Sequence, residues 1–108
     1  MKLGDIILVP FPFTDFSTKK LRPAVVIGLT DDKYKDVIVS AISSVVSHKL
    51  SKSEILLRPT SVNKLRATSI IKVDRIVTLK SADIVGRLGK LSSSEIENFR
   101  MQFKELVD

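Results

Sequence analysis

The amino-acid sequence predicts a mainly β fold: a small, SH3-like antiparallel barrel with short helices and one C-terminal helix. Several short runs are rich in Val and Ile, each run ends at a proline or a polar turn, and only the last stretch has helical periodicity. With 108 residues, 44% of them hydrophobic, the chain can bury one core without a disulfide or a metal. We therefore expect residues 1–108 to form a single domain.

The expected strands are separated by clear turn signals. A continuous apolar run that is rich in β-branched residues is typical of a buried strand. Prolines end the first and the fourth run, since proline cannot donate a hydrogen bond to a neighbouring strand. The strands that we expect are residues 3–10, 24–29, 37–46, 53–59 and 68–79, the last of these as one long strand or two short ones.

The connecting segments are rich in polar residues. A short helix is expected to begin at Ser81 and to be weakened by Gly86 and Gly89, because glycine is a poor helix former. The other connections are a loop over residues 11–20, a turn over residues 30–36, and a helical turn or a loop over residues 60–67.

The C-terminal helix has the clearest signal in the sequence. Ser92 and Glu95 form an S-x-x-E capping box, which satisfies backbone groups at the start of a helix. Apolar residues then follow at helical spacing and form one stripe that we expect to pack on the sheet. This stripe consists of Ile96, Phe99, Phe103, Leu106 and Val107.

The composition excludes several kinds of chemistry. The chain has no cysteine and therefore no disulfide, no cysteine-based zinc site and no thiol nucleophile. It has one histidine, His48, so a single chain cannot form a two-histidine acid–base pair. Asp31 and Asp32 are adjacent in a lysine-rich turn and are interpreted as turn formers. No motif for a bound nucleotide cofactor is present, so we expect neither a metal nor a cofactor.

The location of the protein is also constrained by the sequence. The N-terminal stretch "MKLGDIILVPFPF" does not resemble a secretory signal, and the apolar runs are far shorter than a membrane span. The absence of cysteine suits a reducing compartment. We therefore expect a cytoplasmic protein with no membrane association.

The net charge of +6 favours an anionic partner. Residues 92–108 carry four acidic and two basic side chains, so the excess of positive charge lies in residues 1–91, with 16 basic and 8 acidic side chains. The same excess of positive charge is also expected if the charge serves only to keep the protein soluble.

The stretch "STKKLRPAVVIGL" places three cations just before the second strand. Pro23 restricts the backbone of Arg22 to extended conformations, and the guanidinium group offers a fork of donors that matches phosphate oxygens. Lys19 and Lys20 add mobile charges that attract a polyanion. The pattern is consistent with a phosphate site and with a solvated loop.

The third strand is unusual because Ser40, Ser43 and Ser44 interrupt an apolar run. Side chains alternate between the two faces of a strand, so Ser43 and Ser44 point in opposite directions. A buried hydroxyl destabilises the fold unless it finds a partner. Each serine therefore either bonds to the backbone of a neighbouring strand or belongs to a site.

Four segments together resemble the MazF/PemK (Kid) toxins of bacterial toxin–antitoxin pairs. "GDIILVPFPFTD…KKLRPAVVIG" resembles the opening of these toxins, and "VIVSAISS" resembles their third strand. "ATSIIKVDRIVTL" resembles a later strand pair, and "GRLGKLSSSEIENF" resembles the closing turn and helix. The four segments occur in the order of the family and span nearly the whole chain.

The resemblance implies a homodimeric, metal-independent endoribonuclease toxin that cuts single-stranded RNA at short motifs. The catalytic pair of the family corresponds to Arg22 and Ser43; a shift of one residue would put Ser44 in the second position. Other residues implied in RNA binding are Thr14, Lys19, Lys20, Pro23, Ser44, Ser69, Asp74 and Arg75. The implied partners are single-stranded RNA, a cognate acidic antitoxin and, through that antitoxin, DNA.

The implied reaction needs no protein nucleophile. A ribose 2′-OH attacks the adjacent phosphate and leaves a 2′,3′-cyclic phosphate and a 5′-OH end. Arg22 would stabilise the charge of the transition state, and Ser43 would position the phosphate or the 2′-OH. Arginine is a poor proton acceptor, so the base that removes the 2′-OH proton is not identified.

Two other functions fit a barrel of this kind. One is a non-catalytic module that binds RNA or protein. The other is a gyrase poison of the CcdB type, which relies on a C-terminal tryptophan, and this chain contains no Trp.

Overall fold

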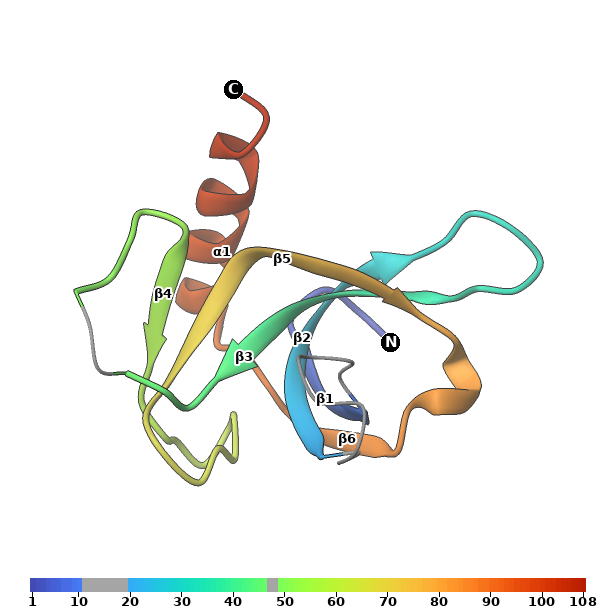
Figure 1. Cartoon of the computed structure of the whole chain (residues 1–108), viewed down its shortest axis with the longest axis horizontal. Coiled ribbons are helices and arrows are strands. Elements are labelled where there is room, and N and C mark those ends of the chain that lie inside the picture. Colours follow the sequence, from blue (N-terminus) through green and yellow to red (C-terminus); the bar gives the residue numbers. More distant parts are fainter. Residues whose placement is uncertain (11–19, 47–48) are drawn as a thin grey trace.

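The computed structural model describes residues 1–10, 20–46 and 49–108. Within these residues six strands form one antiparallel sheet with the spatial order β4-β5-β3-β2-β1-β6. The sheet curls strongly into a half-barrel, which confirms the predicted fold class (Figure 1). The strands are β1 (Asp5–Pro10), β2 (Leu21–Leu29), β3 (Val37–Ser43), β4 (Glu54–Leu57), β5 (Ser69–Leu79) and β6 (Gly86–Lys90).

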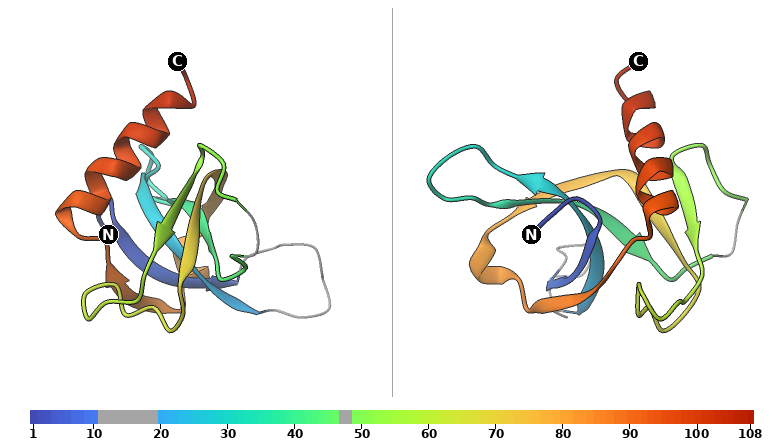
Figure 2. Two further views of the ribbon diagram at one scale, coloured as in Figure 1. Left: turned by 90° about the vertical axis from the view of Figure 1, so that its left-hand side faces the viewer. Right: turned by 180° about the vertical axis from the view of Figure 1, so that it is seen from behind.

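The C-terminal helix α1 (Ser93–Glu105) begins with the predicted capping box. The Ser92 Oγ atom accepts a hydrogen bond from the Glu95 backbone at 3.2 Å, and the Ser92 backbone donates to the Glu95 carboxylate at 2.7 Å. Figure 2 shows the helix lying outside the curl of the sheet, where Phe99 is 1% exposed. The described part of the chain has no helix that is long and apolar enough to span a membrane.

The predicted apolar stripe of α1 is only partly correct. Phe99 is buried, and Ile96 and Phe103 pack against the same core cluster. Leu106 and Val107 are 38% and 80% exposed. They lie beyond the helix end at Glu105 and belong to neither core cluster of the described residues.

Two apolar clusters lie on opposite faces of the sheet, as the alternation of side chains along a strand requires. The larger cluster is shared with α1 and includes Ile6, Val25, Ile42, Ile71 and Phe99. The second cluster consists of Ile7, Val9, Ala24, Val26, Val37, Val39 and Ala41.

The expectation of a helix from Ser81 was wrong beyond its first turn. A single 3-10 turn, η1 (Ser81–Asp83), is followed by β6, which pairs with β1. Residues 86–90 have weak helix propensity because two of them are glycine, and pairing with the exposed edge of β1 outweighs it. The expected bounds of the second strand also change, because β2 begins at Leu21 and thus contains Arg22 and Pro23.

The long strand β5 carries a bulge that bends it (Figure 1). Lys72 pairs with Ala41, but the next pair is Ile76 with Ser40, so residues 73–75 have no counterpart on β3. Ser40 is fully buried, and its hydroxyl donates a 3.0 Å hydrogen bond to the Val73 carbonyl inside this bulge. This serine therefore bonds to a neighbouring strand, which is one of the two alternatives that its position in the sequence allowed.

Residues 58–68 form a loop that leaves β4, docks on β6 and returns into β5. Asn63 is fully buried and holds the loop. Its Oδ1 atom accepts hydrogen bonds of 3.0 Å from the backbone of Thr60 and of Leu65, and its Nδ2 atom donates to the Arg58 carbonyl at 2.8 Å. The Lys90 backbone of β6 donates to the carbonyl of residue 62 in the loop at 3.1 Å.

The close approach of this loop requires Gly89. A Cβ atom at that position would lie 2.5 Å from the carbonyl oxygens of Val62 and Asn63. The loop thus lies against the edge of β6, at the side of the half-barrel where β4 and β6 do not pair with each other.

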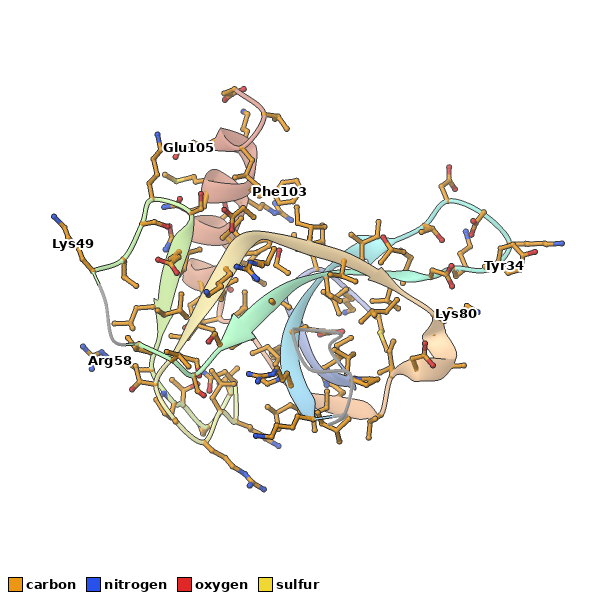
Figure 3. All side chains as sticks on the ribbon, viewed as in Figure 1. Tyr34, Lys49, Arg58, Lys80, Phe103 and Glu105 are labelled. Atoms are coloured by element: carbon orange, nitrogen blue, oxygen red, sulfur yellow. The ribbon has the colours of Figure 1, made fainter. Side chains whose placement is uncertain are left out.

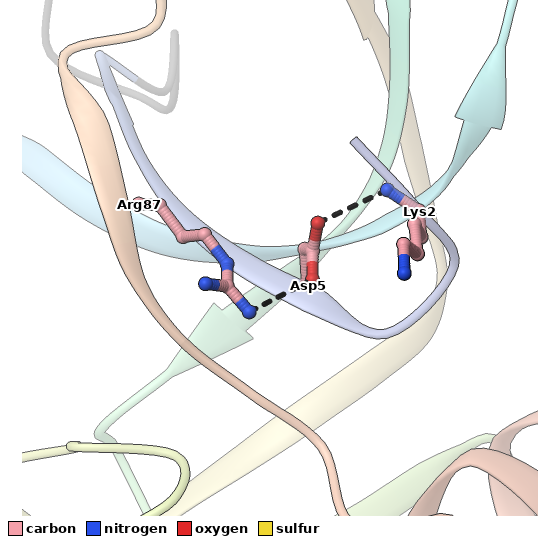
Figure 4. Close-up of polar contacts among 3 residues, drawn as sticks. All are labelled: Lys2, Asp5 and Arg87. Atoms are coloured by element: carbon pink, nitrogen blue, oxygen red, sulfur yellow. Dashed lines mark hydrogen bonds and ion pairs between the residues drawn. The ribbon is translucent and has the colours of Figure 1, made fainter.

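Short polar contacts fix the start of the chain and the β2–β3 turn. Figure 4 shows Asp5 between the Lys2 backbone, which donates at 3.0 Å, and Arg87 of β6 at 3.3 Å. In the β2–β3 turn, which Figure 3 marks at Tyr34, the Thr30 hydroxyl donates to Asp32 at 2.8 Å. That hydrogen bond, together with those from backbone amides, lowers the pKa of Asp32. Asp32 is thus a turn former, as predicted.

Candidate functional site

Arg22 and Ser43 lie on adjacent strands and face the same side of the sheet. β2 and β3 pair through Ala24 and Ala41, and continuing this antiparallel register by two residues brings Arg22 opposite Ser43. Both residues line a pocket of about 150 Å³ at this end of the sheet, where Arg22 is half-buried. The structure therefore brings the two predicted catalytic residues together.

The same pocket is lined by Lys72 and Arg75 of β5. In a regular strand, residues three positions apart face opposite sides, so these two side chains would be separated by the sheet. The bulge at residues 73–75 changes this alternation and brings both cations to one side. Three cations thus surround the pocket, and none of the described residues that line it is acidic.

Ser43 lies at the last position of β3, and its hydroxyl is oriented by the chain that follows. The Val45 backbone amide donates a 3.2 Å hydrogen bond to the Ser43 Oγ atom. Since this bond uses a lone pair of the hydroxyl, its hydrogen can be donated to a group in the pocket. A hydroxyl donor beside three cations is suited to holding a phosphate.

A second pocket, of about 480 Å³, lies at the same end of the sheet on the opposite face. Pro23, Ser44 and Ser69, all predicted to bind RNA, line it. The alternation of strand side chains explains this division, since Pro23 follows Arg22 and Ser44 follows Ser43. The remaining lining residues are Leu8, Leu21, Leu65, Arg66, Ala67 and Leu88.

Two further residues predicted to bind RNA lie outside both pockets. Asp74 is exposed in the β5 bulge, and Lys20 is exposed immediately before β2. Neither lines one of the two pockets. Thr14, Lys19 and His48 lie outside the described residues.

Two residues that line the pockets, Lys72 and Arg66, were not among the predicted site residues. Lys72 interrupts the apolar run "SIIKVDRIV" as the serines interrupt β3, so a cation within a buried strand was the available signal. Arg66 had no comparable signal, because its position at a pocket depends on the docking of residues 58–68 on β6.

A metal centre was not expected from the sequence. Among the residues that the structure describes, no group of three or more His, Cys, Asp or Glu side chains is arranged to hold a metal ion.

Several solved structures of other proteins have a similar fold. The chain is similar to an endoribonuclease in complex with its cognate antitoxin from Mycobacterial species, with a TM-score of 0.72 and 12% identity over 99% of this chain and 94% of the other. The Mycobacterium tuberculosis toxin MazF-mt6 has a TM-score of 0.71 and 20% identity over 96% of each chain. A crystallised Mtb toxin has a TM-score of 0.64 and 20% identity over 93% of this chain and 97% of that one.

These identities establish the likeness of fold alone, and no curated protein matches the chain. The sequence model of one family, described as the PemK-like, MazF-like toxin of type II toxin–antitoxin system, matches residues 2–107. Because this match spans nearly the whole sequence, the chain belongs to the PemK-like, MazF-like toxin family of type II toxin–antitoxin systems.

Proposed function

We propose that this toxin is a metal-independent endoribonuclease that cleaves single-stranded RNA in the cytoplasm, with Arg22 and Ser43 as its catalytic residues. The observation that carries the proposal is the pocket in which Ser43 lies with three cations and no acidic lining residue among those described. Such a pocket favours a phosphodiester, whose oxygens are negatively charged and accept hydrogen bonds.

In the proposed reaction the ribose 2′-oxygen attacks the adjacent phosphorus. A new P–O2′ bond forms, the P–O5′ bond breaks, and the products are a 2′,3′-cyclic phosphate and a 5′-OH end. The 2′-OH proton passes to solvent, and the leaving 5′-oxygen takes up a proton. Atoms and charge therefore balance without a protein nucleophile.

The pocket residues act on the charge that develops at the phosphate. Arg22, half-buried at the start of β2, donates to the non-bridging oxygens as negative charge accumulates. The Ser43 hydroxyl positions the same phosphate group. Lys72 and Arg75 add positive charge that attracts the RNA backbone.

Inhibition by a cognate acidic antitoxin belongs to the same proposal. One structural neighbour is described as an endoribonuclease in complex with its cognate antitoxin, and the net charge of +6 favours an acidic partner. We further propose that the toxin is a homodimer and that it associates with DNA only through the antitoxin.

The alternatives make different predictions. A non-catalytic barrel would bind RNA with strong salt dependence and cleave nothing. A gyrase poison of the CcdB type would inhibit gyrase, and the absence of Trp argues against it.

The proposal is tested by incubating the purified toxin with a long defined RNA in EDTA and mapping the ends. We expect discrete cuts with 5′-OH ends, slowed by about 10²–10³-fold in Arg22→Ala and less strongly in Ser43→Ala. Arg100→Ala is the matched control, since Arg100 is exposed on α1 and does not line the pocket.

Each outcome has a clear meaning. If RNA remains intact while the toxin still binds it, the protein is a binding module. If cleavage requires added divalent metal, the metal-independent mechanism is wrong. If Arg22→Ala cleaves as fast as Arg100→Ala, the catalytic centre lies elsewhere.

A further inference from the structure

The second pocket has the chemical character of a nucleobase site. A base presents flat apolar faces and a polar edge. Apolar side chains of three strands and the 58–68 loop form the walls of this 480 Å³ pocket, and Ser44, Ser69 and Arg66 supply the polar groups. Ser69 is 4% exposed and its hydroxyl already donates to the Ala67 carbonyl at 2.9 Å, so its oxygen is left to accept a hydrogen bond.

The two pockets are adjacent through the backbone. Arg22 and Ser43 line the first, and the next residues of the chain, Pro23 and Ser44, line the second. An RNA strand that passes around this end of the sheet, with its scissile phosphate in the first pocket, would bring a nearby nucleotide to the second. The two pockets thus lie on opposite faces of the same end of the sheet and are joined through consecutive residues of β2 and of the chain after β3.

Arg66 is held at this pocket by the docking of its loop. Leu65, the preceding residue, is 8% exposed and packs in the larger core cluster. Two residues earlier, Asn63 is buried with three side-chain hydrogen bonds to the loop backbone. Because β5 begins at Ser69, the backbone on both sides of Arg66 is fixed, so only the exposed Arg66 side chain must be ordered when a ligand binds.

We propose that Arg66 is a specificity residue that recognises the base of a nucleotide adjacent to the cleaved bond, with guanine preferred. Arginine recognises guanine through two hydrogen bonds to O6 and N7, and such a pair discriminates against other bases. A guanine would stack on the apolar walls with this edge toward Arg66. The inference rests on the proposed ribonuclease function, because the cleaved phosphate defines the neighbouring nucleotide.

The test compares the cleavage motifs of four proteins on a randomised RNA library: the wild type, Arg66→Ala, Arg66→Lys and Arg58→Ala. Arg58 is the matched control because it starts the same loop, is exposed, and does not line the pocket (Figure 3). We expect guanine at a fixed position beside the wild-type cut, a preference that Arg66→Ala reduces by about ten-fold or more. Arg66→Lys should retain part of it, and Arg58→Ala all of it.

A binding measurement separates the failure of this inference from the failure of the proposed function. Fluorescence anisotropy measures the affinity of the protein for oligonucleotides made entirely of 2′-deoxynucleotides, which lack the attacking 2′-OH. Two such oligonucleotides are compared, with guanine or adenine at one position. Weaker discrimination between the two in Arg66→Ala supports the inference even if the wild type cleaves no RNA. In that case the absence of cleavage would reject the nuclease, and the loss of discrimination would still support the contact between Arg66 and the base.

Three results would overturn the role of Arg66. The first is an Arg66→Ala enzyme that cuts at the wild-type motif. The second is a uniform loss of cleavage and binding at all sequences, which would indicate a phosphate contact. The third is unchanged base preference with weakened binding of an acidic, apolar peptide, which would make the pocket a protein-docking site.

Discussion

Replacing Asn63 by alanine should destabilise the protein, because its side chain holds the 58–68 loop. Asn63 is fully buried and its side chain makes three hydrogen bonds, at 3.0, 3.0 and 2.8 Å. Each such bond contributes about 1 kcal/mol net, and a buried amide left without an acceptor costs about 1–3 kcal/mol. We therefore expect the free energy of unfolding of Asn63→Ala to be lower by about 3 kcal/mol.

Thermal and urea denaturation followed by circular dichroism measure this change. For a domain of this size, about 3 kcal/mol corresponds to a decrease in Tm of roughly 12–20 °C. Asn98→Ala is the matched control: Asn98 is exposed on α1, and alanine has the higher helix propensity, so Tm should be unchanged or slightly raised. A Tm of Asn63→Ala within about 3 °C of the control would refute the view that this side chain holds the loop.

Three further predictions concern the bulge, the loop contact and the turn. Ser40→Ala should lower stability by about 1–2 kcal/mol and also slow RNA cleavage, because the bulge that it bonds to positions two pocket cations; normal stability and normal cleavage would contradict this role. Gly89→Ala should lower the midpoint of urea unfolding by an amount that corresponds to about 1–3 kcal/mol, while Gly86→Ala, where a Cβ meets nothing within 4 Å, should not. The pKa of Asp32, lowered chiefly by the Thr30 hydroxyl, should be measurable by NMR below the ordinary aspartate value. Its contribution to stability is present above that ordinary value and is lost as the pH falls through the lower folded value; a titration midpoint at or above the ordinary value would contradict the hydrogen bonds of the turn.

Local sequence patterns were sufficient to predict much of the fold. The runs of Val and Ile predicted β1 to β5 to within a few residues, and the capping box at Ser92 predicted the start of α1. Such features depend on a residue and its near neighbours, which explains why sequence alone reveals them. Leu106 and Val107 were misassigned because burial depends on what lies opposite a side chain, and both residues follow the end of α1 and remain exposed.

Local sequence patterns could not predict β6 or the docking of residues 58–68 on it. Residues 86–90 become a strand because the edge of β1 is available, although the two segments are about eighty residues apart in sequence. Arg66 reaches a pocket because Asn63 and Gly89 let the loop approach β6. Neither contact has a local sequence signature.

The sequence by itself determined the class of the fold, the capped helix, the basic character of the chain and the alternation that separates Ser43 from Ser44. It also carried the resemblance that the family match confirms. Only the tertiary structure decided which cations share a pocket with Ser43, since the bulge in β5 reverses the facing of Arg75 relative to Lys72. The physical reason is that strand alternation is a local property, whereas a bulge arises from pairing with a distant strand and from the buried hydrogen bond of Ser40.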